Sequence, residues 1–254
     1  MEGSTVSIKS SVSIVLAACV ALLTACAQTQ LATAPTPPPA TAPAAPPEVA
    51  SGAVSNPAWA KDMDAFAAQD AANPPPRHAV LFIGSSSIRM WSTLAQDFAG
   101  TPVINRGFGG SEVRDSTYYA DRIVVPYQPR EIVFYAGDND LAAGRSVQQV
   151  VQDTFAFIAR VRRDLPGVPV VYLSIKPSPS RAQLLPQIRQ VNAQIAARAA
   201  RLQGVHFVDV FTPMLGADGQ PRRELFREDM LHMTPEGYAI WTRALKPYVE
   251  GSAR

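Results

Sequence analysis

Three short segments of the sequence place polar side chains and glycines where buried strands are expected to end: 84–87, 105–111 and 136–140; a fourth, 229–235, lies near the end of the chain. A serine becomes a nucleophile when a histidine accepts its proton, and the histidine needs an acceptor that fixes its tautomer. The segments contain these residue types as Ser86, His232 and Asp229. The chemistry that they predict is acyl transfer through a covalent intermediate.

Acyl transfer also needs hydrogen-bond donors for the oxyanion, and the same segments supply candidates. They are the backbone N–H groups of Ser86 and Gly110 and the side-chain amide of Asn139. Glycine suits such a position because a backbone without Cβ can approach a substrate closely. Removal of one donor of this kind typically lowers turnover about 10²–10³-fold.

Each segment has a plainer interpretation when it is considered alone. Serines commonly cap helices, glycines permit tight turns, and Asn and Asp are ordinary turn residues. Asp229 can be a plain surface acid. The other histidines, His78 and His206, lie beside or within apolar runs, and we expect structural roles for both. It is the combination of all four segments that favours catalysis.

Apolar runs and helical periodicity predict a parallel sheet that positions these segments. Strands are expected at 79–83, 102–105, 131–135, 168–175 and 205–210, with helix-like stretches near 59–67, 88–98, 111–122, 147–164, 186–203 and 235–248. This alternation is typical of βαβ units, and ligands of such sheets lie outside the carboxyl ends of the strands. The predicted fold class is α/β, with a five-stranded parallel sheet in a flavodoxin-like order and helices on both faces.

The motifs Gly84-x-Ser86, Gly109-Gly110-Ser111, Gly137-x-Asn139-Asp140 and Asp229-x-x-His232 resemble the four blocks of the SGNH/GDSL hydrolase family, in family order. The resemblance covers about residues 78–248. It implies a flavodoxin-like three-layer αβα sandwich and a serine esterase without metal or cofactor. It also implies Ser86 as nucleophile, Gly110 and Asn139 as oxyanion donors, His232 as base and Asp229 as the residue that orients it.

One position departs from the family pattern, because Ser85 stands where the family has Asp. Three adjacent hydroxyls result, of which the family register selects Ser86, with Ser87 as the alternative. The G-x-S-x-G elbow of the α/β-hydrolases is not met, because Ile88 occupies its last position. Thr234-Pro235 is expected to form the N-cap and first residue of a helix that fixes the histidine's loop.

The N-terminal segment, residues 1–26, resembles a bacterial lipoprotein signal peptide. Lys9 precedes an apolar run over 12–23 that is too short to span a bilayer comfortably. The run ends in Leu23-Thr24-Ala25-Cys26, which resembles a lipobox and predicts lipidation of Cys26. An ordinary secretory signal and a retained membrane anchor are the alternatives.

Residues 27–57 are rich in Ala, Pro and Thr and are expected to form a disordered tether, followed by the hydrolase domain at 58–254. Together with the lipobox, this organisation predicts a lipid-anchored protein of the bacterial cell envelope, on the periplasmic face of a membrane.

Composition excludes several other classes of site. The chain of 254 residues has a net charge of +2, and its basic residues are scattered, so no nucleic-acid partner is expected. Its two cysteines, Cys19 and Cys26, both lie in the N-terminal segment. A catalytic thiol and a Cys-ligated zinc are therefore excluded from the mature chain.

The expected substrate is an ester with a modest acyl group: a lysophospholipid, a short-chain ester, or an O-acetyl group on a polysaccharide. The segment 176–181, after the fourth strand, either shapes the pocket or is a proline-stiffened loop. Two alternatives to hydrolysis are an acyltransferase that uses the same acyl-enzyme and a binding lipoprotein that has lost turnover.

Overall fold

The structure is a computed structural model that describes residues 54–251. The predictions for the signal peptide, for Cys26 and for most of the tether fall outside this range. Ser55, within the expected tether, donates a backbone hydrogen bond of 2.7 Å to the Asp115 carboxylate. No helix among the described residues is long and apolar enough to cross a membrane.

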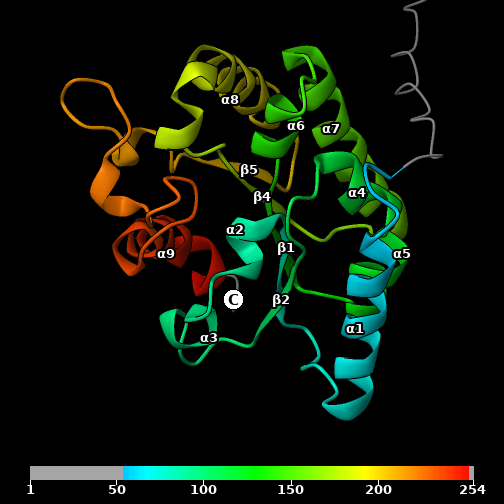
Figure 1. The fold of residues 1–254 in the computed structure, drawn as a ribbon. Coiled ribbons are helices and arrows are strands. Elements are labelled where there is room, and N and C mark those ends of the chain that lie inside the picture. The colour runs from blue at the N-terminus through cyan, green and yellow to red at the C-terminus, as the bar shows by residue number, and fades with distance from the viewer. Residues whose placement is uncertain (1–53, 252–254) are drawn as a thin grey trace, which may run out of the picture. The chain divides into compact units, whose positions relative to one another are not determined.

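A parallel sheet of five strands forms the centre of the described fold (Figure 1). The spatial order is β2-β1-β3-β4-β5, which confirms the flavodoxin-like order predicted from the sequence. The strands are β1 (Val80–Gly84), β2 (Val103–Gly107), β3 (Glu131–Tyr135), β4 (Val170–Leu173) and β5 (Val205–Val208). The chain crosses from β2 over β1 to reach β3, so the order reverses beside β1. Ligands of open α/β sheets lie at such a reversal.

Alternate strand residues pack against helices on opposite faces of the sheet. Phe82 and Tyr135 belong to one apolar cluster with α2 (Ser86–Arg89), α3 (Leu94–Asp97) and α9 (Pro235–Val249). Leu81 and Phe134 belong to the other cluster. Its helices are α1 (Trp59–Ala72), α4 (Val113–Tyr118), α5 (Ala120–Ile123), α6 (Asp138–Ala142), α7 (Val147–Asp164) and α8 (Leu185–Ala199). This confirms the three-layer αβα sandwich, because side chains of successive strand residues point to opposite faces.

Two stretches predicted as single helices are interrupted. The stretch 88–98 divides into α2 and α3, and 111–122 divides into α4 and α5. Between α2 and α3, the Trp91 indole packs into the core against Phe82 and Trp241. Its Nε1–H donates a hydrogen bond of 2.6 Å to Asp97. The apolar residues at helical spacing in this stretch are therefore buried without forming one continuous helix.

Candidate active site

The loops after β1, β2 and β3 begin side by side at the carboxyl edge of the sheet. Gly84, the last residue of β1, pairs with Gly107 of β2 and Tyr135 of β3. Ser86 follows Gly84 by two residues, Gly110 follows Gly107 by three, and Asn139 follows Tyr135 by four. Three of the four predicted segments therefore start at one place in the fold.

Ser86 is the first residue of α2 and lies on a sharp turn after β1. Gly84 has φ +138°, and a Cβ there would lie 1.8 Å from the carbonyl oxygen of Tyr135, so only glycine fits. Ser85 occupies the N-cap position, but its side chain makes no cap hydrogen bond. Ser85 and Ser87 are 1% and 2% exposed, whereas Ser86 is partly exposed. Of the three serines, Ser86 is the one that a substrate can reach.

The segment 229–235 forms a tight loop that ends at α9. Met230 has φ +53°, in the left-handed region, and this turns the chain back between Asp229 and His232. Asp229 Oδ1 accepts hydrogen bonds of 2.9 Å from the backbone N–H groups of Leu231 and His232. Thr234 is the N-cap of α9 and accepts a hydrogen bond from Gly237, with a proline at the start of the helix, as predicted.

Asp229 is held in its ionised form. Burial acts to raise its pKa, but hydrogen bonds from the backbone N–H and the imidazole of His232 outweigh burial and lower the pKa to about 2. Its side chain is 48% exposed. The carboxylate is therefore ionised near neutral pH, where it can only accept hydrogen bonds.

Ser86, His232 and Asp229 form a continuous chain of hydrogen bonds. His232 Nδ1 lies 2.6 Å from Asp229 Oδ2, and His232 Nε2 lies 2.9 Å from Ser86 Oγ. A carboxylate can only accept, so Nδ1 carries the proton and Nε2 is free to accept the proton of the serine. The two segments that meet here are separated by 146 positions in the sequence.

The predicted oxyanion donors lie in the loops and helices that follow β1, β2 and β3 at the carboxyl edge of the sheet. The N–H of Ser86 begins a helix, so it has no partner within the helix. Gly110 is exposed with φ +80°, a conformation that a residue with a side chain rarely adopts. Asn139 lies in α6 (Asp138–Ala142), and its Nδ2 donates a hydrogen bond of 2.9 Å to the carbonyl of Ser111. That carbonyl belongs to the residue that follows Gly110.

The residues that sequence reasoning missed form a charged cluster behind Asn139. Lys176, only 1% exposed, places Nζ 2.9 Å from Asp138 Oδ2. Arg181 contacts the same carboxylate oxygen at 3.0 Å and donates a hydrogen bond of 2.8 Å to Asn139 Oδ1. The only signal in the sequence was the position of 176–181 after a strand.

The charge states in this cluster follow from burial and from its ion pairs. Burial acts to raise the pKa of Asp138, but Lys176 and Arg181 outweigh it and lower the pKa to about 2. Burial lowers the pKa of Lys176, and Asp138 opposes this shift. The neighbouring Asp140 has no cationic partner of this kind, and burial raises its pKa to about 8.

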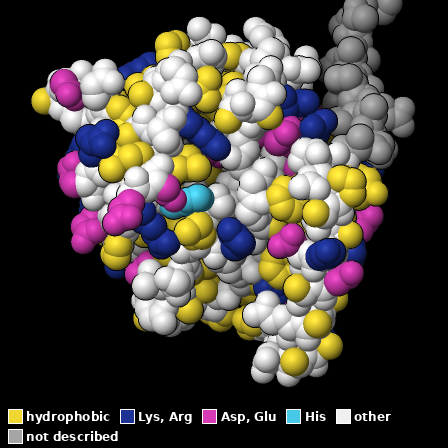
Figure 2. Space-filling model, viewed as in Figure 1, with side chains coloured by type: hydrophobic (Ala, Val, Ile, Leu, Met, Phe, Trp, Pro, Cys, Tyr) yellow, Lys and Arg dark blue, Asp and Glu magenta, His cyan; other side chains and the backbone are white. Residues whose placement is uncertain are grey.

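The other two histidines lie elsewhere in the fold. His78 precedes β1, at the opposite end of the strand from Ser86. His206 lies on β5, the edge strand, where its ring centroid is 5.3 Å from that of Tyr248. On the face shown in Figure 2, one histidine is visible with an acidic side chain beside it and basic side chains on either side.

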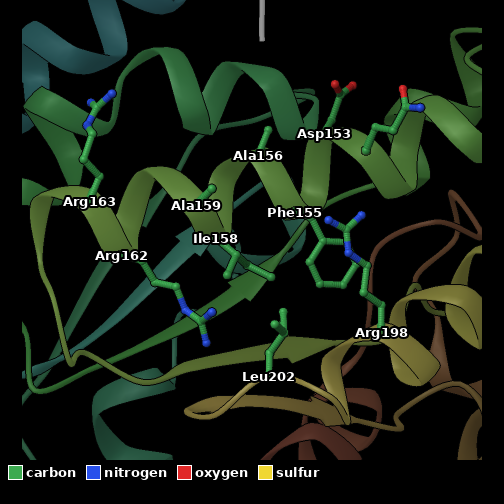
Figure 3. A pocket seen from close by; sticks show the side chains of 10 residues that line it. Asp153, Phe155, Ala156, Ile158, Ala159, Arg162, Arg163, Arg198 and Leu202 are labelled. Carbon is green, nitrogen blue, oxygen red and sulfur yellow. The ribbon is translucent and has the colours of Figure 1, made fainter. Parts of the chain in front are cut away.

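A cavity of about 590 Å³ lies between α7 and α8 (Figure 3). Phe155, Ile158 and Leu202 give it an apolar floor, with Arg162 and Arg198 at its border. None of the candidate site residues lines it, and it contains no serine or histidine. Among residues 54–251, no group of three His, Cys, Asp or Glu side chains could hold a metal ion.

Solved structures with the same fold include several named as esterases or lipases. An acylhydrolase-named protein of Bacteroides fragilis NCTC 9343 has TM-score 0.66 and 22% identity, covering 75% of this chain and 97% of its own. A GDSL-like lipase of Bacteroides thetaiotaomicron VPI-5482 has TM-score 0.65 and 23% identity, covering 75% and 98%. An acetyl esterase mutant with acetate ion has TM-score 0.54 and 18% identity, covering 68% and 96%. At these identities the likeness establishes the fold. No curated protein matches the chain.

The family assignment comes from the sequence itself. The family model of the GDSL-like lipase/acylhydrolase family matches residues 84–240, which run from the end of β1 into α9. The matched region contains Ser86, Gly110, Asn139, Asp229 and His232. The chain therefore belongs to the GDSL-like lipase/acylhydrolase family, and it is an enzyme that hydrolyses esters.

Proposed function

We propose that the protein is a serine esterase in which Ser86 is the nucleophile, His232 the general base and Asp229 the group that orients the histidine. The observation that carries this proposal is the hydrogen-bond chain of 2.9 Å and 2.6 Å that links the three side chains. Both distances lie within the range in which a positioned base can accept a proton. The exposure of Ser86 beside two buried serines supports its choice as nucleophile.

In the acylation step, Ser86 Oγ attacks the ester carbonyl carbon while His232 Nε2 takes the hydroxyl proton. The imidazolium that forms donates through Nδ1 to the ionised Asp229, which stabilises it. The carbonyl oxygen becomes an oxyanion, and we assign its donors as the N–H groups of Ser86 and Gly110 and the Asn139 amide. The carbon–oxygen bond to the alcohol then breaks, and His232 returns the proton to the leaving oxygen.

In the deacylation step, water attacks the acyl-Ser86 ester and transfers a proton to His232 Nε2. The second tetrahedral intermediate uses the same donors. Its collapse breaks the bond to Ser86 Oγ, which regains a proton from His232, and it releases the carboxylic acid. Each proton is transferred between Ser86, water or the alcohol and one nitrogen of His232, so no metal or cofactor is required.

We propose esters with a modest acyl group as substrates: lysophospholipids, short-chain esters or O-acetyl groups of polysaccharides. Support comes from the fold shared with an acetyl esterase and with a lipase. We also propose that Cys26 carries a lipid that anchors the enzyme to the periplasmic face of a membrane. Support for the anchor comes from the apolar run and the Leu23-Thr24-Ala25-Cys26 sequence.

The test compares the three serines in the purified full-length protein, with p-nitrophenyl esters of increasing acyl length. Ser86→Ala should lower kcat at least about 10⁴-fold, as loss of a serine nucleophile does elsewhere. Ser87→Ala is the matched control and should retain activity. If activity survives in Ser86→Ala but disappears in Ser87→Ala, the nucleophile is Ser87 and the proposal for Ser86 is wrong. The profile of kcat/KM against acyl length separates acetyl esters from lipids.

A further inference from the structure

The amide of Asn139 is held by a partner on each side. Arg181 donates to its Oδ1 at 2.8 Å, and its Nδ2 donates to the Ser111 carbonyl at 2.9 Å. An amide nitrogen has two hydrogens, so one remains available to a ligand. A cation on Oδ1 also prevents the amide from rotating by 180°, because that would set NH₂ against the guanidinium. Arg181 and the Ser111 carbonyl together determine which end of Asn139 is a donor.

Arg181 is itself fixed by a buried ion cluster. Asp138 Oδ2 contacts Arg181 at 3.0 Å and Lys176 at 2.9 Å, and Lys176 is 1% exposed. Lys176 Nζ is also 3.2 Å from the Tyr135 hydroxyl, at the end of β3. One carboxylate thus faces two cations. The Arg181 guanidinium places positive charge against the Asn139 amide, in a region where low polarity strengthens electrostatic interactions.

We propose that Arg181, held by Asp138 and Lys176, is a positioning residue that directs the Asn139 amide and adds positive potential toward the oxyanion. This inference rests on the proposed function, since it needs Asn139 as an oxyanion donor. Loss of such a donor costs about 10²–10³ in turnover, and a donor that is present but misdirected costs part of that. We expect Arg181→Met to lower kcat about 10- to 100-fold, with a smaller change in KM.

The experiment is a double-mutant cycle of Arg181→Met and Asn139→Ala, with hydrolysis of p-nitrophenyl acetate as readout. If Arg181 acts through Asn139, Arg181→Met changes kcat less than about 3-fold in the Asn139→Ala background. An equal loss in both backgrounds, or no loss in the wild-type background, overturns the proposal. Arg201→Met is the matched control, because Arg201 is exposed just beyond α8, and it should leave kcat unchanged.

Arg181→Lys keeps the inference testable if Arg181→Met unfolds. Lysine can pair with Asp138 but cannot also bond Asn139 through a second fixed nitrogen. We therefore expect near-normal thermal stability with reduced kcat, and retained kcat would overturn the inference. Failure of the proposed function has a different signature, because Ser86→Ala would then remain active whatever Arg181 does.

A second, independent observation concerns two glycines after β2. Gly107 and Gly109 do not have positive φ, so backbone conformation does not require glycine at either position. Close approach of backbone requires glycine at 107, whereas a side chain at 109 would meet only the movable end of Arg89. A Cβ on Gly107 would lie 2.2 Å from the backbone nitrogen of Arg89, and a Cβ on Gly109 would lie 2.8 Å from the Arg89 guanidinium carbon. The missing side chain at 109 leaves the space that the guanidinium occupies.

Arg89 is an exposed cation at the rim of the site. It follows Ser86 by three residues in α2, and residues at this spacing share a helix face. Its guanidinium lies against Gly109, which precedes Gly110. Among residues 54–251, no Asp or Glu forms an ion pair with it.

We infer that Arg89 binds an anionic group, a carboxylate or a phosphate, that the substrate ester carries, and we test this with the anion placed on the alcohol side. A planar guanidinium recognises both groups by paired hydrogen bonds. The inference deepens the proposed function by naming a charged class of substrate. It does not depend on the role of Arg181.

The test uses phenyl acetates that differ only at the para position: 4-acetoxybenzamide, 4-acetoxybenzoate and 4-acetoxyphenyl phosphate. Arg89→Gln should lower kcat/KM about 10-fold for the anionic esters and leave the neutral amide unchanged. A monoacylglycerol phosphate and its uncharged monoacylglycerol, in neutral detergent, test whether a lipid is the source of the phosphate. Gly109→Ala should act in the same direction as Arg89→Gln, because its Cβ displaces the guanidinium.

Arg201→Gln is the matched control, and it should change none of these ratios. A preference for anionic esters that comes from Arg89 should also weaken as salt is raised. An equal effect of Arg89→Gln on neutral and anionic esters, or no effect on either, overturns the inference. If Ser86→Ala loses all activity but Arg89→Gln keeps the same charge preference, the esterase mechanism stands. Only the inference that Arg89 binds an anionic group is then refuted.

Discussion

Replacement of Asp229 by asparagine tests how the loop 229–235 controls the histidine. Asp229 Oδ1 accepts two backbone N–H groups, while Oδ2 faces His232 Nδ1. In Asp229→Asn, the amide oxygen must take the place of Oδ1, because NH₂ there would oppose two donors. The NH₂ group then faces Nδ1 and donates to it. His232 is left with its proton on Nε2, which cannot accept the proton of Ser86.

The size of the loss follows from two contributions. Turning the amide to restore the productive tautomer gives up two hydrogen bonds, at about 0.5–1.5 kcal/mol each. The imidazolium also loses a charged hydrogen-bond acceptor, worth about 1.5–3 kcal/mol. With about 1.4 kcal/mol for each factor of ten, the expected loss in kcat is about 10²–10⁴-fold. The KM should change much less, because Asp229 contacts the histidine rather than the substrate.

The assay is steady-state hydrolysis of p-nitrophenyl acetate, with circular dichroism and thermal unfolding to verify the fold. Asp229→Ala is the companion variant, since the half-exposed site leaves room for a small carboxylate beside His232. Formate should restore part of the activity of Asp229→Ala and none of that of Asp229→Asn. The tautomer argument is refuted if Asp229→Asn keeps more than a tenth of the wild-type kcat, or if formate activates both variants equally.

Three further predictions concern other parts of the chain. Burial raises the pKa of Asp140 to about 8 from 3.8, so the folded protein binds more protons than the unfolded chain between about pH 4 and 8, and stability falls as pH rises through that window. Asp140→Asn should remove this component, measured by urea unfolding at pH 5 and pH 8; an unchanged pH dependence would contradict the shift. The Ser85 hydroxyl is buried without a hydrogen-bond partner, so Ser85→Ala should keep activity and raise the unfolding free energy by up to about 1 kcal/mol, whereas a clear destabilisation would reveal a missed partner. Cys26→Ser should move the protein from the membrane to the soluble fraction of fractionated cells, and persistent membrane association would argue against the lipid anchor.

The fold and the common starting point of the segments that carry Ser86, Gly110 and Asn139 could be predicted because both depend on strand ends. Apolar runs indicate where strands lie, and in a parallel sheet their carboxyl ends share one edge. The segments that carry Ser86 and Asn139 then start at the same edge, and side by side once β1 and β3 are adjacent. The loop with His232 is different, since it follows no strand directly. It was the family resemblance and the three-residue spacing from Asp229 that indicated its place.

The contacts of Arg181 and Arg89 could not be predicted, because they depend on irregular backbone. Arg181 lies in a 3-10 segment, Pro179–Leu184, with a kink at Arg181 itself, and no periodicity in the sequence indicates where its side chain points. From the sequence, Gly109 is interpreted as a turn glycine. Only the structure shows that the Arg89 guanidinium lies against it. The break between α2 and α3 was missed for a related reason, since burial of Trp91 produces the same spacing as a continuous helix.

The measurement that tests the account most directly is labelling of the full-length protein with a fluorophosphonate probe, followed by peptide mass spectrometry. The probe phosphonylates a serine only when an activated hydroxyl and an oxyanion site are both present. The account predicts one modified residue, Ser86, with loss of ester hydrolysis in proportion to labelling and no labelling in His232→Ala. Labelling at Ser85 or Ser87, or full hydrolysis by a protein whose Ser86 is fully modified, would contradict it.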